Sequence, residues 1–340
     1  MPRVLPQSWR DDYAEREGVK VDAERAEDPV AGPEAAVTRN PRLRQRRWFR
    51  VLASGVFFIA LMEASYLAYP NPNLVPAMIV YAAFLVPVVF VVHLHERLEA
   101  TELPVASIVV CFISAGAVGL AFASTVLALF VPQLGFSKFL VVGPVEETAK
   151  MIVPLAVCAL GAYRSEGAGV MVGLVSAMAF SALETAGYGF NAFLGNFSGG
   201  DTGRVADLFE GPVNLVALDA NVVARSLFSP VGHATWTMLV CFALFHESTK
   251  AGRFVINGRV ILAFVLASLL HACWDTTLGI PPDPAWGKAL GWVAFAATAA
   301  LTGWLMKRII RRTREEMGAG RGAAGVSDLT HPPRRAEGSP

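Results

Sequence analysis

The residues best suited to chemistry in this chain are Glu146, Glu147 and Lys150, which lie in an otherwise apolar stretch. On a helix, Lys150 stands four residues from Glu146 and three from Glu147, so its ammonium can reach either carboxylate. A charged side chain near the centre of a bilayer costs roughly 2.5–3.5 kcal/mol, so such groups must be paired or face water. The spacing predicts one carboxylate held ionised by Lys150 and a second free for acid–base chemistry. The alternative is a structural ion pair that locks two helices together.

Further ionisable residues lie inside three later apolar stretches: Glu184, His233, and the pair His271 and Asp275. His271 and Asp275 are four residues apart, the spacing at which a carboxylate accepts a hydrogen bond from an imidazole N–H and fixes its tautomer. The other ring nitrogen is then free to bind a metal or take a proton. Taken alone, His233 could be a hydrogen-bonded core residue and Glu184 a helix contact. Arg225, near the edge of the stretch that holds His233, can extend to the membrane interface or meet a substrate carbonyl.

Together, these side chains have the composition of a site that activates a water molecule. Glu184, His233 and His271 offer the nitrogen and oxygen ligands that zinc accepts, so Zn²⁺ is the suspected cofactor. The sequence leaves open a second possibility, in which a glutamate activates the water without a metal. A spare carboxylate remains as the base, and the sequence leaves open which of the adjacent glutamates it is. The candidate catalytic residues are Glu146, Glu147, Lys150, Glu184, His233, His271 and Asp275.

The elements that must position these residues are long apolar helices. The chain has 340 residues, of which 54% are hydrophobic and 17% charged, a balance that excludes an ordinary soluble domain. Several stretches have about the 20 apolar residues that a helix needs to cross a bilayer: residues 49–69, 74–94, 104–131, 138–162, 167–190, 221–245, 258–280 and 286–306. The expected fold is all-α, a polytopic transmembrane helical bundle of about eight transmembrane helices.

Both ends of the chain are expected to be disordered cytoplasmic tails. Residues 1–41 and 313–340 have few large apolar side chains and cannot bury enough surface to fold. The transmembrane domain is therefore expected to occupy residues 42–312.

The distribution of basic residues predicts the orientation of the bundle. Arginines and lysines gather before residue 51, in the loops at 95–103 and 246–257, and after residue 306, whereas the opposite loops carry few. By the positive-inside rule, both termini are cytoplasmic. At 1.5 Å per residue, the ionisable residues of the fourth to seventh stretches lie roughly 9–18 Å from the outer ends of their helices. Four helices are therefore expected to bring them to one layer in the outer half of the bilayer.

The zinc-protease motif HExxH is absent from the chain. The run from His246 and Glu247 begins like it, but Lys250 stands where the second histidine would be. The run also falls at a predicted cytoplasmic loop, so we interpret it as solvated surface.

The ordered set of motifs resembles the PrsW family of intramembrane proteases and the wider superfamily of CAAX prenyl endopeptidases and bacteriocin-processing relatives. The motifs are E-E-x-x-K at 146–150, F-x-x-x-E at 180–184, the isolated His233 and H-x-x-x-D at 271–275. The resemblance covers roughly residues 49–306. Glu184 stands where the prenyl endopeptidases have a histidine, which agrees with PrsW and argues against CAAX substrates.

The resemblance implies an endopeptidase that cuts a membrane-embedded or membrane-proximal peptide bond. The implied substrate is a single-span membrane protein such as an anti-sigma factor, cut on the outer side of a bacterial cytoplasmic membrane. The lipid bilayer is the other expected partner, and no nucleic acid is expected. By the same resemblance, Glu146 or Glu147 is the base, Lys150 is its charge partner, and His233 matches the family's single histidine.

Two alternatives belong to other functional classes. Buried carboxylates and histidines also relay protons, so the same residues would suit a proton-coupled transporter. A catalytically inactive scaffold that keeps the fold to hold partner proteins is the other alternative.

Overall fold

The computed structural model describes residues 20–21, 37–38, 47–98, 103–131, 134, 138–163, 165–195, 215–278 and 285–330. Within them the fold is helical, apart from an antiparallel pair of two-residue strands, β1 (Lys20–Val21) and β2 (Val37–Thr38). The helices are α3 (Arg47–Ala68), α4 (Leu74–Arg97), α5 (Val105–Phe130), α6 (Lys138–Ala159), α7 (Glu166–Gly195), α8 (Leu215–Phe228), the π-helical η5 (Pro230–Ala234), α9 (Thr235–Ala251), α10 (Gly258–Leu278) and α11 (Ala285–Thr330).

The predicted transmembrane helical bundle is confirmed. In the part of the chain that the structure describes, 7 helical stretches are long and apolar enough to cross a membrane. One of them, Leu218–Ala251, joins α8, η5 and α9 and matches the predicted stretch at 221–245. The remaining predicted crossing is α6. It is 22 residues long, like α3, but it carries Glu146, Glu147 and Lys150. Its length allows it to cross, and its charges explain why its composition is less apolar.

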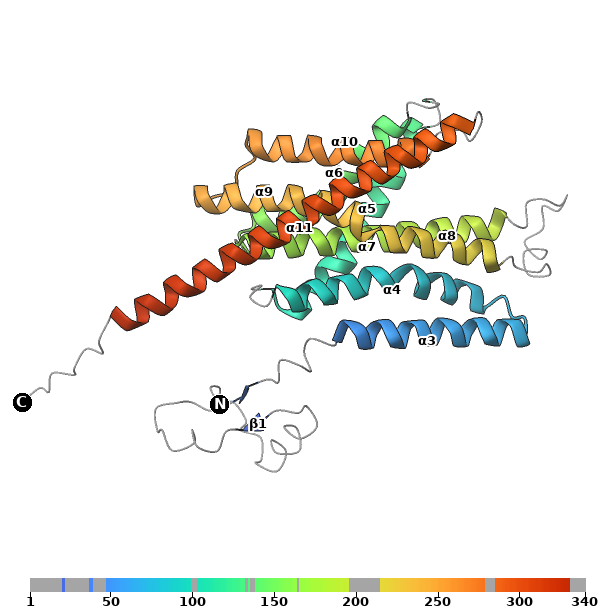
Figure 1. The fold of residues 1–340 in the computed structure, drawn as a ribbon, viewed down its shortest axis with the longest axis horizontal. Helices are drawn as coiled ribbons and strands as arrows, with labels where there is room; N and C mark the ends of the chain where they lie inside the picture. Colours follow the sequence, from blue (N-terminus) through green and yellow to red (C-terminus); the bar gives the residue numbers. More distant parts are fainter. Residues whose placement is uncertain are drawn as a thin grey trace, which may run out of the picture.

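The central helix of the bundle is α7, which packs against α4, α5, α6, α8 and α9 (Figure 1). Small residues allow this close packing. A Cβ atom on Gly169 would lie 2.4 Å from the Phe245 ring, and one on Gly173 would lie 2.8 Å from Cys241. Close approach of backbones is how membrane helices associate, because lipid tails provide no hydrophobic driving force between them.

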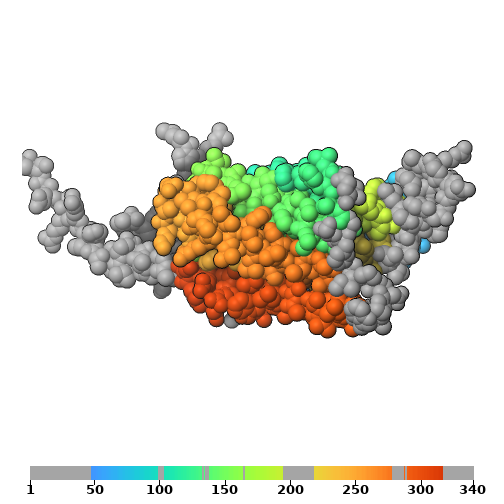
Figure 2. Space-filling view, turned by 90° about the horizontal axis from the view of Figure 1, so that it is seen from above, coloured from blue at the N-terminus to red at the C-terminus, as the bar shows by residue number. Residues whose placement is uncertain are grey.

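One side of the bundle is formed by α6, α10 and α11. Figure 2 shows them as the green, orange and red regions of one face, and α10 packs against both of the others. The crossing of α6 and α10 is tight, because a Cβ atom on Gly143 would lie 2.6 Å from the carbonyl oxygen of Ser268. One turn further along these helices stand Glu147 and His271, so this crossing sets the spacing of two candidate site residues.

The opposite edge of the bundle is α3, which packs against α4 (Figure 1). Among its side chains only Tyr66 is buried. The other side chains are at least partly exposed, as expected for a helix that faces lipid.

The start of α3 and the end of α11 lie at the same end of the bundle (Figure 1), as an even number of crossings requires. Helix α11 runs to Thr330, past residue 312, where the sequence predicts a disordered tail to begin. Most of the predicted tail at 1–41, and residues 331–340, lie outside the described residues.

Candidate active site

The two adjacent glutamates and the lysine of α6 lie inside the bundle. Glu147 and Lys150 are fully buried and Glu146 nearly so. The Lys150 Nζ atom is 2.8 Å from Glu147 Oε1 and 3.5 Å from Glu146 Oε2. The ammonium reaches both carboxylates, as the helical spacing predicts, and its shorter contact is with Glu147.

Both oxygens of Glu147 are engaged by hydrogen bonds. Oε1 accepts from Lys150 Nζ and lies 3.0 Å from His271 Nδ1, while Oε2 accepts from the Thr237 hydroxyl at 3.1 Å. Hydrogen bonds to a charged group are about twice as strong as neutral ones. Glu147 therefore ties α6 to α9 and α10, and it does not line the cavity described below.

Glu146 differs from its neighbour because it lines a cavity and its buried Oε2 atom has no hydrogen-bond partner. This oxygen is 3.5 Å from His271 Nε2. Leaving a buried acceptor unsatisfied costs about 1–3 kcal/mol, and more for a charged group. A cation, a water molecule or a donor group of a substrate would satisfy it.

His271, on α10, stands between three carboxylates. Its Nδ1 atom faces Glu147, and its Nε2 atom faces Glu146 Oε2 and, at 3.6 Å, Asp275 Oδ2. With Nδ1–H donating to Glu147, the Nε2 lone pair points toward Glu146. The indole of Trp236 stacks on the imidazole with ring centroids 4.5 Å apart, which fixes the plane of the ring.

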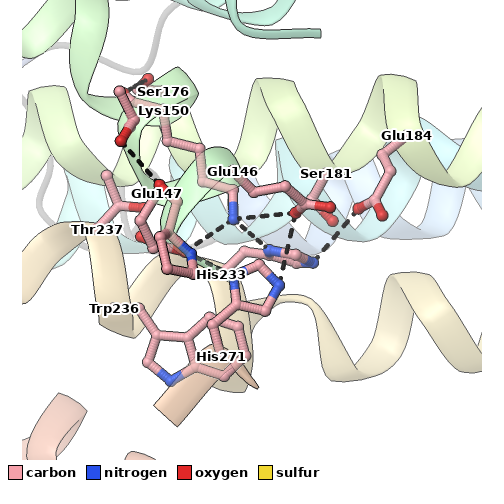
Figure 3. Close-up of polar contacts among 12 residues, drawn as sticks. Glu146, Glu147, Lys150, Ser176, Ser181, Glu184, His233, Trp236, Thr237 and His271 are labelled. Atoms are coloured by element: carbon pink, nitrogen blue, oxygen red, sulfur yellow. Dashed lines mark hydrogen bonds and ion pairs between the residues drawn. The ribbon is translucent and has the colours of Figure 1, made fainter. Parts of the chain in front are cut away.

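His233 meets His271 from the other side of the site, with ring centroids 5.1 Å apart (Figure 3). Its Nδ1 atom is 2.8 Å from Lys150 Nζ, and its Nε2 atom is 3.4 Å from Glu184 Oε2. Both imidazoles therefore use Nδ1 to contact the Glu147–Lys150 pair and direct Nε2 toward a second carboxylate.

A π-helical turn holds His233. Pro230 begins η5 and has no N–H, and the Ala234 N–H donates to the Ser229 carbonyl at 3.4 Å, five residues back. The Ser229 hydroxyl donates to Ser181 Oγ at 2.6 Å and ties the turn to α7. Such single π turns inside α-helices are frequent at functional sites.

Glu184, on α7, is held by an arginine. Its Oε1 atom is 2.8 Å from Arg225 Nη2, and the guanidinium lies 3.7 Å from the centre of the Tyr188 ring. Glu184 Oε2 and Arg225 Nε are buried and have no hydrogen-bond partner. This ion pair leaves one acceptor and one donor available beside the histidines.

The site opens into a cavity of about 770 Å³, a size typical of ligand pockets. Helices α5 to α11 and the π-helical η5 all contribute to its lining. The polar side chains Glu146, Glu184, His233, His271 and Asp275 all face it, and most of the remaining lining is apolar. Residues from four of the predicted spans therefore meet around one cavity.

Three of these residues could hold a metal ion. Glu146, His233 and His271 each offer a ligand atom, and these atoms lie within 4.8 Å of one another. His271 is ready to bind, because its Nδ1–H donates to a carboxylate and leaves Nε2 free. His233 can bind a metal only after losing a proton. While Lys150 is an ammonium, it donates to His233 Nδ1, and the ring hydrogen of His233 is then on Nε2. Metal binding through Nε2 must then release one proton from the Lys150–His233 pair.

The balance of charge around the cavity also favours a divalent cation. Four carboxylates and two cationic side chains are in mutual contact there, directly or through the imidazoles: Glu146, Glu147, Glu184, Asp275, Lys150 and Arg225. If all are ionised, two negative charges are left without a partner in this group. Buried charges must be paired or bind a metal, and a divalent ion supplies the missing charge.

Two details differ from the sequence-based expectation. Glu184, expected as a metal ligand, lies outside the group of three ligand atoms, which contains Glu146 in its place. Asp275, expected to fix the tautomer of His271, lies near Nε2, whereas Nδ1 is bound by Glu147.

Three further residues that hold the site residues in place were not predicted from the sequence. Trp236 stacks on His271, Thr237 donates to Glu147, and Ser176 donates to the backbone carbonyl of Lys150 at 2.5 Å. Helical spacing could have indicated the first two, because they follow His233 by three and four residues.

The HExxH-like run lies away from this cavity. His246 forms an ion pair with Glu166, and Glu247 accepts from Arg259 Nη1 at 2.9 Å. Neither His246 nor Glu247 lines the cavity. His246 and Glu166 also form a second possible metal group with the exposed Glu316.

Comparison with known protein families agrees with this geometry. A family model described as PrsW family intramembrane metalloprotease matches residues 99–302, which include all the site residues described above. No curated protein and no solved structure matched the chain. The matched range spans more than half of the 340 residues. The family match favours peptide hydrolysis over the transporter and scaffold alternatives. The chain belongs to the PrsW family of intramembrane metalloproteases.

Proposed function

We propose that the protein hydrolyses a peptide bond of a single-span membrane protein, such as an anti-sigma factor, with Glu146 as the general base. The observation that carries this proposal is the Glu146 Oε2 atom, which lies buried at the cavity without a hydrogen bond and 3.5 Å from both His271 Nε2 and Lys150 Nζ. A carboxylate in that position can accept a proton from a water molecule that the histidines hold.

The adjacent glutamates then have separate roles. Glu147 keeps the Nδ1–H of His271 fixed by hydrogen bonding and stays ionised beside Lys150. It is a positioning residue, because both of its oxygens are already occupied. Glu146 is left to act on the water, so it is the base in this proposal.

Zinc is the metal that suits the site, and His233 and His271 would hold it. Two imidazole nitrogens with carboxylate oxygens are a donor set found in catalytic zinc sites. When bound, such an ion lowers the pKa of its water and polarises the scissile carbonyl. Glu184 is the third protein donor in this proposal, because its Oε2 atom accepts no hydrogen bond and is 3.4 Å from His233 Nε2. Glu146, whose oxygen lies within 4.8 Å of the two histidine nitrogens, is the other candidate for this donor, and zinc content distinguishes the two. Lys150 lies between His233 and Glu147, where it balances the charge of the buried carboxylates.

The proposed setting is a bacterial cytoplasmic membrane with both termini cytoplasmic and cleavage in the outer half of the bilayer. It is supported by the excess of basic residues on one face. Single cysteines placed in the loops at 70–73 and 252–257 test it with a membrane-impermeant thiol reagent on intact cells. Labelling at 70–73 alone is expected, and labelling at 252–257 alone would show the reverse orientation.

The reaction is tested with purified protein in vesicles that also contain a single-span peptide. We expect cleavage by the zinc-loaded protein, loss of about 10²–10⁴-fold in rate for Glu146→Gln, and loss of both zinc and cleavage for His271→Ala. Zinc bound per protein, measured by elemental analysis, separates the roles, because the loss of a base leaves the metal in place. If Glu146→Gln lost its zinc, Glu146 would be a ligand and not the base. Undiminished cleavage by Glu146→Gln would end the proposal.

A further inference from the structure

A set of aromatic rings lines a part of the cavity that the proposed hydrolysis does not use. Phe228, Trp274, Trp292 and Phe295, from α8, α10 and α11, form what we call the aromatic wall. The ring centroids of Trp274 and Phe295 are 4.4 Å apart, and Phe295 lies 5.6 Å from Phe228 and 6.0 Å from Trp292. The wall is therefore a continuous ring surface built by three helices.

The aromatic wall begins directly beside the reactive groups. Trp236 stacks on His271 at 4.5 Å and makes an edge-to-face contact with Trp274 at 5.9 Å. Rings thus follow one another from the imidazole next to Glu146 to the far side of the cavity. A group bound on the wall would lie next to the bond that the site cuts.

Core packing does not account for the aromatic wall, because part of its ring surface is open. Phe228 is 42% exposed and Trp292 is 60% exposed, although both line the cavity. A belt of aromatic residues at the membrane interface would explain Trp292. It does not explain Trp274 and Phe295, which are largely covered and also line the cavity. Apolar rings that line a cavity beside a few polar groups are typical of a ligand-binding site.

Apolar side chains of α5 and α6 also line the cavity. They are Leu127, Phe139 and Val142, joined by Val131 after the end of α5 and by the basic Lys138. The volume of about 770 Å³ far exceeds the roughly 30 Å³ that one water molecule occupies. The cavity can hold a bulky apolar group in addition to the reacting peptide bond.

Polar groups at the edge of this space suit a peptide main chain. Arg225 lines the cavity and has an unpartnered Nε–H donor, and the hydroxyls of Ser181 and Thr185 line it as well. Donors beside an apolar pocket are the usual arrangement of a site that binds one side chain and its backbone.

We infer that the aromatic wall is the specificity pocket of the enzyme and receives a large apolar side chain, aromatic or leucine-like, of the residue that flanks the scissile bond. This inference rests on the proposed function, and it narrows the substrate to membrane segments with such a residue at the cleavage site. Small side chains leave the rings uncovered, and negatively charged ones bring a negative charge onto the electron-rich ring faces, so both bind more weakly.

The test uses matched single-span peptides that carry Phe, Leu, Ala or Asp at the residue flanking the cut, with cleavage followed by mass spectrometry. For the zinc-loaded protein we expect kcat/KM at least about tenfold higher for Phe and Leu than for Ala, with Asp lowest. The variant Phe295→Ala removes the central ring of the wall and should lower the Phe-to-Ala ratio roughly 2- to 10-fold. Equal kcat/KM for all four peptides would overturn the inference.

A matched control lies on the same helix. Trp304, also on α11, is half exposed and does not line the cavity, so Trp304→Ala should keep the wild-type ratio. Phe295→Leu keeps the volume of the wall and guards against a folding defect in Phe295→Ala. A ratio that changes in Trp304→Ala as much as in Phe295→Ala would remove the assignment to the aromatic wall.

Binding separates this inference from the proposed function. The Glu146→Gln variant keeps the pocket, so its affinity for the Phe and Ala peptides in vesicles can be measured without turnover. Tighter binding of the Phe peptide together with no cleavage by the wild type would leave the pocket standing and sink the hydrolase proposal. Cleavage by the wild type together with equal affinity for both peptides would support the hydrolase proposal and rule out the specificity pocket.

Discussion

Two clusters of glutamate, histidine and basic side chains occur in this bundle, and they differ in position more than in composition. The buried cluster contains Glu146, Glu147, Lys150, Glu184, His233 and His271 and lies around the cavity. The helix-end cluster contains Glu166, His246, Glu247 and Arg259 and lies near the ends of α7, α9 and α10. By sequence alone, the second begins like a zinc-protease motif and the first does not.

The difference between the clusters is access to water. The basic and imidazole groups differ most: the side chains of Lys150 and His271 are 0% and 2% exposed, whereas those of Arg259 and His246 are 71% and 38% exposed. The glutamates differ less, since Glu247 is 11% and Glu184 13% exposed. An exposed ion pair contributes little, because water and salt screen it. A buried charge must find a partner, so each contact in the buried cluster has a large effect. Burial, and not residue type, separates a reactive site from a solvated surface.

The largest expected effect is therefore that of Lys150→Met. This change leaves the carboxylate of Glu147 buried without its cation, which typically costs about 3–5 kcal/mol. It also removes the contact to His233 Nδ1, so we expect cleavage to fall by about 10²-fold or more. Thermal unfolding in detergent and peptide cleavage in vesicles measure the two effects.

Two further variants complete the Lys150 experiment. Lys250→Met, at the exposed end of α9, is the matched control and should change stability by less than about 0.5 kcal/mol. The double variant Lys150→Met with Glu147→Leu should recover part of the lost stability without recovering activity, because both partners are then apolar. Wild-type stability in the Lys150→Met single variant would show that the Lys150–Glu147 ion pair does not stabilise the buried cluster.

Most of the bundle could be predicted from the sequence, because crossing a bilayer fixes the length and polarity of a helix. The boundaries of α3 to α7 follow the apolar stretches closely. The pairing of Lys150 with both glutamates also follows from helical spacing. The continuation of α11 to Thr330 did not follow, since no apolar pattern marks that segment.

Contacts between helices were harder to predict than the helices themselves. The bond from His271 to Glu147 joins residues 124 apart in sequence, and it depends on how far each helix is rotated about its axis. The π turn at Pro230–Ala234 changes that rotation for His233, and hydropathy gives no signal of it. The sequence therefore predicted which residues meet, but not which carboxylate binds which imidazole.

A smaller loss is expected when the helices of the buried cluster are moved without changing its residues. Gly143→Val adds a side chain whose Cβ atom would meet the Ser268 carbonyl oxygen at 2.6 Å, so α6 and α10 must separate. Overpacking of this kind costs about 1–3 kcal/mol. Displacing His271 from Glu146 by about 1 Å should lower the cleavage rate by up to roughly 10²-fold.

The control for this displacement is Gly303→Val on α11, where an added Cβ atom has nothing within 4 Å. It should keep both activity and zinc content near wild type. Activity that stays intact in Gly143→Val would mean that the site tolerates a wider crossing than its geometry implies.

The smallest effect is expected in the helix-end cluster. His246→Ala removes the ion pair with Glu166, and Glu247→Ala removes the acceptor for Arg259 and for Asn257 Nδ2, which donates at 2.7 Å. Because one partner of each pair, His246 or Arg259, is exposed to solvent, each change should alter stability by about 0.5 kcal/mol or less. The cleavage rate should stay within about twofold of wild type, since neither residue lines the cavity. A tenfold loss of cleavage in His246→Ala, with zinc content unchanged, would show that residue type and not burial had identified the site.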